Sequence, residues 1–281
     1  MIDQLAGDYT SIRRRFGVVV FIQSKKGKIQ MSYFAQHHMG LVALSYLISV
    51  CGAFVALQMA NYIPNREGGL NHGWMTMAAV VFGSCAIWAM HFTGMLAYRL
   101  EFVATYDVAM TLLSLAIPIA FSAIGFQVVY RWPDSTPAWL GAGVVFGGGV
   151  AAMHYVGMAA LRADAHMHHD QTITAIAIGI AIVAATVALR IVVHWKGRLR
   201  LLSPLIMGLA VCGMHYTAMM GMEFQAAGSG TGIDYFNGAW SAQFMGFISG
   251  LAVLLTLLIG AAMVVVRKSL DINPQASLAN A

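Results

Sequence analysis

The sequence predicts an all-α membrane protein with seven transmembrane helices, arranged as three two-helix repeats plus a final helix. Of its 281 residues, 59% are hydrophobic and only 10% are charged, whereas soluble domains average about 25% charged residues. The mean hydropathy is +0.72. Seven apolar runs are each long enough to span a bilayer, which takes about 20 residues. Three closely similar hexapeptides recur along the chain, each near the end of an even-numbered run.

The seven apolar runs are separated by polar or turn-like connections. Most connections are short, so consecutive helices are expected to be antiparallel neighbours in one bundle. The expected spans are residues 40–61, 75–98, 108–130, 138–161, 172–194, 201–222 and 241–266. In the fourth run, GAGVVFGGGV (141–150) supplies five glycines that let this helix approach its neighbours closely. We therefore expect a seven-helix domain at 40–267, an amino-terminal tail at 1–39 and a short tail at 268–281 without an output domain.

The distribution of Lys and Arg predicts the orientation, because basic residues concentrate in cytoplasmic connections. With the amino-terminal tail left aside, one side receives Arg66, Arg131, Lys196, Arg198, Arg200, Arg267 and Lys268, whereas the other receives only Arg99 and Arg162. This places the basic side in the cytoplasm, with the amino terminus outside and the carboxyl terminus cytoplasmic. The net charge of +5 then reflects topology, and no basic helix or stacking platform favours a nucleic-acid partner.

The amino-terminal tail departs from this rule, because its six basic residues would lie outside. One hypothesis is that Met31 is the native start and that residues 1–30 are an upstream extension. The alternative is a genuine tail that is translocated or lies at the membrane interface.

The internal repeat carries the candidate chemistry. The hexapeptides are MHFTGM (90–95), MHYVGM (153–158) and MHYTAM (214–219). Their histidines, His91, His154 and His215, are 63 and 61 residues apart. Each repeat unit contains two helices, so the chain crosses the membrane in the same direction at every motif. All three motifs are therefore expected at one depth, near the outer surface.

Helical spacing places a thioether four residues after each imidazole, on the same face. The third residue after each histidine is small: Gly94, Gly157 or Ala218. Thioethers are soft ligands that suit Cu(I), and imidazole serves either oxidation state of copper. Zinc prefers thiolate or carboxylate company, and calcium and magnesium need oxygen ligands. The predicted copper ligands are His91, His154, His215, Met95, Met158, Met219, Met90, Met153 and Met214. Whether they form one site or several, and with how many ions, stays open.

The motif residues also have interpretations other than copper binding. A methionine in a membrane helix is ordinarily a packing residue, and a histidine near a helix end can sit at the polar interface. Haem is a rival, since paired histidines on adjacent helices hold haem in membrane cytochromes. HMHHD (166–170) and HHM (37–39) lie on the motif side, and such tracts are either metal-capturing or simply solvated.

The three hexapeptides, their spacing and the context IWAMHFTGM (87–95) resemble the MHYT-domain family of bacterial membrane sensors. The resemblance covers residues 40–267. It implies seven transmembrane segments with motifs near the outer face, copper held by the nine candidate ligands, and sensing of O2, CO or NO. Family members often carry a cytoplasmic output domain, such as a cyclic-di-GMP synthase or phosphodiesterase, whereas only SLDINPQASLANA follows Lys268 here.

The expected function is therefore a copper-binding sensor of a diatomic gas or redox state, embedded in the lipid bilayer and acting through a separate cytoplasmic partner. The alternative is a copper acquisition, delivery or transport protein, in which HMHHD and HHM collect the ion. A membrane copper oxidase ranks below both, because the sequence shows no acid–base pair, and a non-enzymatic role is favoured.

Overall fold

The computed structural model describes residues 12–15, 18–21, 23–25, 28–30, 37–65, 68–99, 104–163, 165–194, 202–226 and 239–272. It has seven helices that are long and apolar enough to cross a membrane, which confirms the predicted fold class. In the amino-terminal tail, β1 (Ile12–Arg15) pairs with β2 (Val18–Phe21), and β3 (Gln23–Lys25) pairs with β4 (Lys28–Gln30). The question of a native start at Met1 or Met31 and the tail beyond residue 272 lie outside the described residues.

The observed helices lie within a few residues of the predicted spans. They are α2 (Met39–Ala60), a continuous helix formed by α3 (His72–Val81), η2 (Phe82–Ala89) and α4 (Met90–Ala97), then α5 (Val108–Arg131), α6 (Thr136–Ala159), α7 (Gln171–His194), α8 (Ser203–Met220) and α9 (Ala242–Ile272). Side-chain caps fix several starts, since Asn71, Asp107 and Ser135 each accept a hydrogen bond from a backbone N–H three residues later. Such caps satisfy donors that the first helical turn leaves unpaired.

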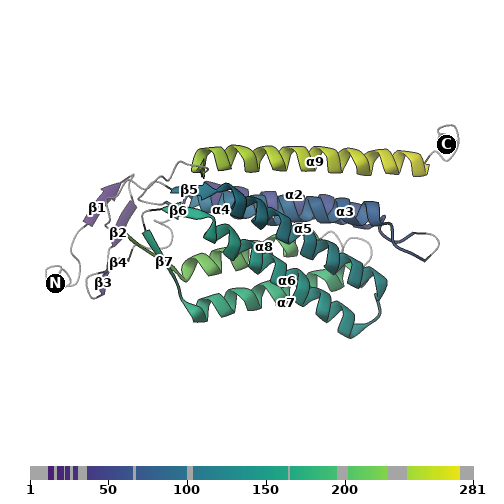
Figure 1. The fold of residues 1–281 in the computed structure, drawn as a ribbon, viewed down its shortest axis with the longest axis horizontal. Coiled ribbons are helices and arrows are strands. Elements are labelled where there is room, and N and C mark those ends of the chain that lie inside the picture. The colour runs from purple at the N-terminus through teal and green to yellow at the C-terminus, as the bar shows by residue number, and fades with distance from the viewer. Residues whose placement is uncertain are drawn as a thin grey trace.

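Six of the seven spans close into a ring. Each contacts the next along the chain, and α8 returns to contact α2. The seventh, α9, packs outside this ring against α2, η2 and α4, and it runs along one side of the bundle in Figure 1. The three repeat units are therefore α2 with the α3–η2–α4 helix, α5 with α6, and α7 with α8.

The second helix of each unit lies on the inside. In the most apolar stretch of each helix, the share of residues that are buried is 83% for His72–Ala97, 61% for Thr136–Ala159 and 56% for Ser203–Met220. The corresponding share is only 33%, 33% and 28% for α2, α5 and α7. Glycine makes this possible on α6, where a Cβ at Gly147 would lie 2.6 Å from the backbone of α7. The predicted packing role holds for Gly143, Gly147 and Gly149, where a Cβ would lie closer than 3 Å to α7 or α5, but not for Gly141 and Gly148, where it would meet nothing within 4 Å.

A π-helical segment, η2, interrupts the first motif helix just before Met90. The wider turn is held from both sides: the Ser49 hydroxyl on α2 donates to the Ala86 carbonyl at 2.7 Å, and the Trp88 indole donates to Ser114 on α5 at 3.1 Å. Segments of π-helix are rare and often mark functional sites. We expected an ordinary α-helix here, because apolar periodicity does not reveal one extra residue in a turn.

Short strands, which we did not predict, lie at the end of the bundle where α4, α6 and α8 end; we refer to it as the motif end. There β5 (Ala104–Asp107) pairs with β6 (Leu161–Ala163) and β9 (Ala239–Ser241). A second ribbon pairs β7 (Ala165–His169) with β8 (Met222–Ala226). Figure 1 shows β5, β6 and β7 gathered at this end. Strands of three to five residues are too short for their alternation to stand out in sequence.

Candidate metal centre

The three motif histidines lie on the three inner helices at one depth. His91 is on α4, His154 on α6 and His215 on α8, each five or six residues before its helix ends. At 1.5 Å per residue this places them about 8 Å inside the helix ends. None is more than 1% exposed. The repeat therefore delivers three imidazoles to the same buried layer, as the sequence predicted.

The three imidazoles converge on a single point. Nδ1 of His91 lies 3.1 Å from Nδ1 of His215 and 3.2 Å from Nδ1 of His154, and the third side of the triangle is 3.2 Å. Their ring planes meet at 80–89°. Together they form a group with the geometry to hold a metal ion. The structure thus favours one shared site over three separate ones.

Hydrogen bonding among the three imidazoles cannot satisfy all three contacts. Each neutral Nδ1 carries either a hydrogen or a lone pair in the ring plane. With two states shared among three atoms, at least two are alike, so at least one contact sets lone pair against lone pair or hydrogen against hydrogen. A central cation would remove the conflict, because all three Nδ1 lone pairs could then serve as ligands.

The triangle has nearly the size that a metal requires. Three nitrogens held 2.0–2.1 Å from one ion lie about 3.3–3.6 Å apart, slightly more than the 3.1–3.2 Å observed. A small outward movement of the rings closes this difference. The residues present therefore fit a three-imidazole metal site.

Glycines in the motifs leave room for the imidazole of a neighbouring helix. A Cβ at Gly157 would lie 2.6 Å from Nε2 of His91, and a Cβ at Gly94 would lie 2.5 Å from Nε2 of His215. In two of the three motifs, the small third residue after the histidine therefore leaves room for an imidazole from another motif helix. The sequence indicated open space at this position but not which side chain fills it.

The outer nitrogens face an apolar environment. The Nε2 atoms of His91, His154 and His215 are buried without a hydrogen-bond partner in the described part of the chain. Metal-bound histidines usually donate this second N–H to a carboxylate, carbonyl or water. Within the described ranges, no carboxylate or thiolate joins the histidine group. The candidate donor set in the described residues is thus three imidazoles that are buried from solvent.

All six candidate methionines are buried on the same three helices. Their exposure is 3% or less, and they belong to the hydrophobic core around the histidines. Met95, Met158 and Met219 lie one turn closer to the motif end than their histidines, and Met90, Met153 and Met214 directly precede them. Burial in a core is what packing alone would also give. Coordination by the thioethers stays a prediction.

A second layer of rings, which we did not predict, covers the histidines. The residue after each histidine meets a ring from the motif end, with centroids 5.3–5.8 Å apart: Phe92 with Tyr106, Tyr155 with His169, and Tyr216 with His37. The signal for this layer is an aromatic residue at the same place in all three hexapeptides. Tyr106 and His37 are 2% exposed, whereas His169 is exposed. The cover is therefore thinnest above Tyr155.

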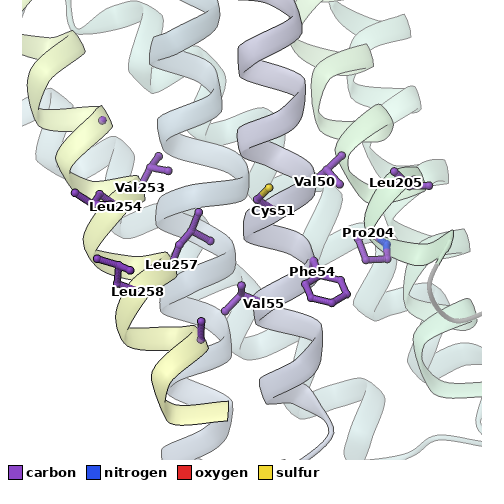
Figure 2. A pocket seen from close by; sticks show the side chains of 12 residues that line it. Val50, Cys51, Phe54, Val55, Pro204, Leu205, Val253, Leu254, Leu257 and Leu258 are labelled. Carbon is purple, nitrogen blue, oxygen red and sulfur yellow. The ribbon is translucent and has the colours of Figure 1, made fainter. Parts of the chain in front are cut away.

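A pocket lies elsewhere, on the flank of the bundle. It has a volume of about 690 Å³ and opens between α2, α8 and α9 (Figure 2). Its lining is apolar, with Phe54, Pro204 and Leu254 among its residues, and it includes none of the nine candidate ligands. The pocket is therefore separate from the histidine centre.

Comparison with known proteins identifies the repeat. The family model described as a bacterial signalling protein N-terminal repeat, MHYT, matches residues 85–142 and 147–203. The third hexapeptide lies beyond both matches, although the structure places its histidine with the other two. No solved structure matches the chain significantly.

Several curated signalling proteins are similar to most of this chain. The bifunctional diguanylate cyclase/cyclic di-GMP phosphodiesterase MucR of Pseudomonas aeruginosa is 34% identical over 78% of this chain and 33% of its own length. The cyclic di-GMP phosphodiesterase NbdA of the same organism is 33% identical over 75% of this chain and 27% of its own. The signalling protein YkoW of Bacillus subtilis is 27% identical over 66% and 24%. The chain thus spans about a third or less of these relatives. With its matched repeats lying on helices of the histidine-bearing bundle, this chain belongs to the MHYT family of bacterial membrane signalling proteins.

Proposed function

We propose that this protein is a copper-binding sensor of the bacterial inner membrane, in which His91, His154 and His215 hold copper near the outer face. The signal is a diatomic gas (O2, CO or NO) or the redox state, and a cytoplasmic partner reads the response. One observation carries the proposal: three buried Nδ1 atoms lie 3.1–3.2 Å apart with no arrangement of hydrogens that satisfies them all.

The donor set favours Cu(I) over divalent ions. Three neutral imidazoles leave the charge of the ion uncompensated in a buried site. The cost of burying an ion rises with the square of its charge, so a divalent ion costs about four times as much as a monovalent one. Structural zinc sites include thiolates that reduce this charge, and three-histidine zinc sites bind solvent as a fourth ligand, whereas the three histidines here are buried from solvent. The buried thioethers of Met95, Met158 and Met219 add soft ligands that also suit Cu(I).

The geometry argues against haem. A haem iron takes its axial histidines from opposite faces of the macrocycle. Here the three Nδ1 atoms lie within 3.2 Å of one another, which leaves no room for a ring system between them. An ion is the occupant that fits.

The protein's own residues would position and isolate this site. Gly94 and Gly157 seat the rings of His215 and His91. The aromatic layer that includes Phe92 and Tyr106 keeps water away from the imidazoles. When bound, Cu(I) with an open coordination position supplies affinity for diatomic ligands.

A route from the site to the far end of the bundle starts at His91. This histidine follows η2, which packs against α2 and α9. Helix α9 in turn fits closely on α2, because a Cβ at Gly260 would lie 2.6 Å from Val55. A rotation of His91 on ligand binding would therefore act on α9, whose carboxyl-terminal half lies away from the motif end.

Charge supports the proposed orientation, and the relatives support the proposed partner. The basic residues Arg131 and Arg267 lie at the opposite end from the motifs, which favours a cytoplasmic location for that end. The names of MucR and NbdA describe enzymes of cyclic di-GMP turnover. We extend this to a partner in the same signalling system, contacted at the cytoplasmic end.

Metal analysis of the purified protein tests the proposal. The parent and the triple variant His91→Ala/His154→Ala/His215→Ala would be reconstituted with Cu(I) under reducing conditions, desalted and measured by inductively coupled plasma mass spectrometry. We expect copper in the parent and none in the variant. A matched variant, His72→Ala/His194→Ala, replaces two exposed histidines at the other end and should retain the metal.

Gas binding is measured on the copper-loaded parent. Infrared spectroscopy of added CO should show a carbon–oxygen stretch shifted from that of free CO, and the triple variant should show none. A parent that holds no copper after reconstitution overturns the metal assignment. A parent that holds copper but never binds O2, CO or NO overturns gas sensing and leaves redox state as the signal.

A further inference from the structure

The β7–β8 ribbon at the motif end carries a cluster of exposed side chains that the histidine centre does not use. β7 has the sequence AHMHH, and its residues His166 and His168 are exposed. Alternate residues of a strand point to the same face, so these two histidines project from the same side of the ribbon. The strands pair in antiparallel register, with His168 directly opposite Glu223.

Directly opposed side chains of an antiparallel pair share a face, so Glu223 lies on the same side as the two histidines. Its Cβ lies about 4.5–5.5 Å from that of His168, as in any opposed pair. His166 and His168 are separated by two residues of strand, about 6.5–7 Å. Exposed side chains change rotamer within nanoseconds, so two imidazoles and a carboxylate can reach one ion here.

We propose that His166, His168 and Glu223 form a second metal site, exposed on the motif end of the molecule and specific for a divalent transition-metal ion. Its chemistry differs from that of the buried trio. A carboxylate and solvent access reduce the cost of a double charge, and mixed imidazole and oxygen ligands suit Cu(II) best among the common divalent ions. The proposal does not depend on metal binding by His91, His154 and His215.

The ribbon also links this surface to the buried centre. His169, next to His168, contacts the ring of Tyr155 at 5.7 Å, and Tyr155 in turn contacts His154 at 4.9 Å. This is the one ring contact of the second layer whose outer member is exposed. The exposed site therefore lies where an ion from solution would first meet the cover of the trio.

A Cu(II) titration of the full-length protein in lipid nanodiscs tests the site. Electron paramagnetic resonance would follow binding to the metal-free parent, to His166→Ala/His168→Ala and to Glu223→Gln. We expect the parent to bind one equivalent through imidazole nitrogen, in a form that EDTA removes at once. The double variant should raise the Kd by about tenfold or more, because two of three ligands are lost, and Glu223→Gln should raise it less.

Two controls make the result decisive. The pair His72→Ala/His194→Ala removes as many exposed histidines from the other end and should leave the Kd unchanged. In His91→Ala/His154→Ala/His215→Ala the EDTA-accessible site should remain, which separates it from the buried centre. If this triple variant does not fold, the exposed double variant still decides. A double variant with the parent's Kd, or a control pair with an equal loss, overturns the proposal.

Discussion

Two groups of histidines lie at the same end of this molecule in opposite environments. His91, His154 and His215 are buried among helices and touch one another through Nδ1. His166 and His168 stand exposed on a two-stranded ribbon. The same side chain therefore meets two different demands. A buried nitrogen without a partner costs free energy of folding. An exposed nitrogen is hydrogen-bonded by water, so folding does not require it to bind a metal.

The difference sets which ion each group suits. The buried trio has no described carboxylate beside it, and this is why the ion we propose there is the singly charged Cu(I). The ribbon has Glu223 across from His168 and is open to water, so a divalent ion is acceptable there. Substitutions in the two groups should therefore have unequal consequences, and four predictions test this.

The largest difference is expected between His154→Ala and His168→Ala. At a Cu(I) concentration 100 times the Kd, binding should stabilise the parent by about 2.7 kcal/mol. His154→Ala should abolish this increment, because it removes one corner of the triangle, and His168→Ala should keep it. Thermal unfolding in detergent, with and without Cu(I), measures both. Equal increments in the two variants would contradict a metal site in the buried trio.

A second contrast uses two glycines of α6. Alanine at Gly157 brings a Cβ within 2.6 Å of Nε2 of His91, whereas nothing lies within 4 Å of a Cβ at Gly148. Gly157→Ala should displace the His91 ring and weaken Cu(I) binding by about 10–100-fold, as loss of a supporting contact does. Gly148→Ala should leave the affinity unchanged. Competition with a Cu(I) chelator measures the affinity of each variant. Equal affinities of Gly157→Ala and Gly148→Ala would show that Cu(I) binding does not need the space at Gly157.

Much of this arrangement could be predicted from the sequence, because hydropathy and repetition report it directly. The seven spans followed from apolar runs, and the shared depth of the histidines followed from two helices per repeat. The convergence of His91, His154 and His215 did not follow, since it depends on which helices lie inside. All seven spans are apolar, and yet their buried shares range from 17% to 83%.

Other features were invisible for physical reasons. The π-helical turn at 82–89 depends on contacts from α2 and α5, including the Ser49–Ala86 bond, and these are not encoded in local periodicity. The pairing of His168 with Glu223 joins segments 55 residues apart through strands of five residues. Tertiary contacts select both features, and the local sequence permits them without requiring them.

The third prediction asks whether the methionines are ligands or only core residues. Met158→Leu preserves volume and burial, so the free energy of unfolding should change by less than about 1.5 kcal/mol. If the thioether binds Cu(I), the affinity should fall by about threefold to tenfold, because a soft ligand is lost. Met245→Leu is the matched control, since Met245 is equally buried on α9. An unchanged affinity for Met158→Leu assigns this methionine to packing.

The smallest effect is expected at the exposed rim, where Asp107 caps α5 and pairs with Arg162. The hydrogen bond from the Met110 backbone N–H and the charge of Arg162 lower the pKa of the Asp107 carboxyl below its ordinary 3.8. A carboxyl whose pKa falls on folding contributes stability that is fully present above its unfolded pKa and is lost as the pH falls through the folded value. Between pH 7 and 4, the unfolding free energies of Asp107→Asn and the parent should therefore run parallel, with the variant lower by the contribution of the charge, since Asn keeps the cap but not the ion pair with Arg162. Below pH 3.8 the parent alone should lose an additional increment in denaturant unfolding. If the unfolding free energies of the two proteins stayed parallel at every pH, the Asp107–Arg162 pair would contribute no measurable stability.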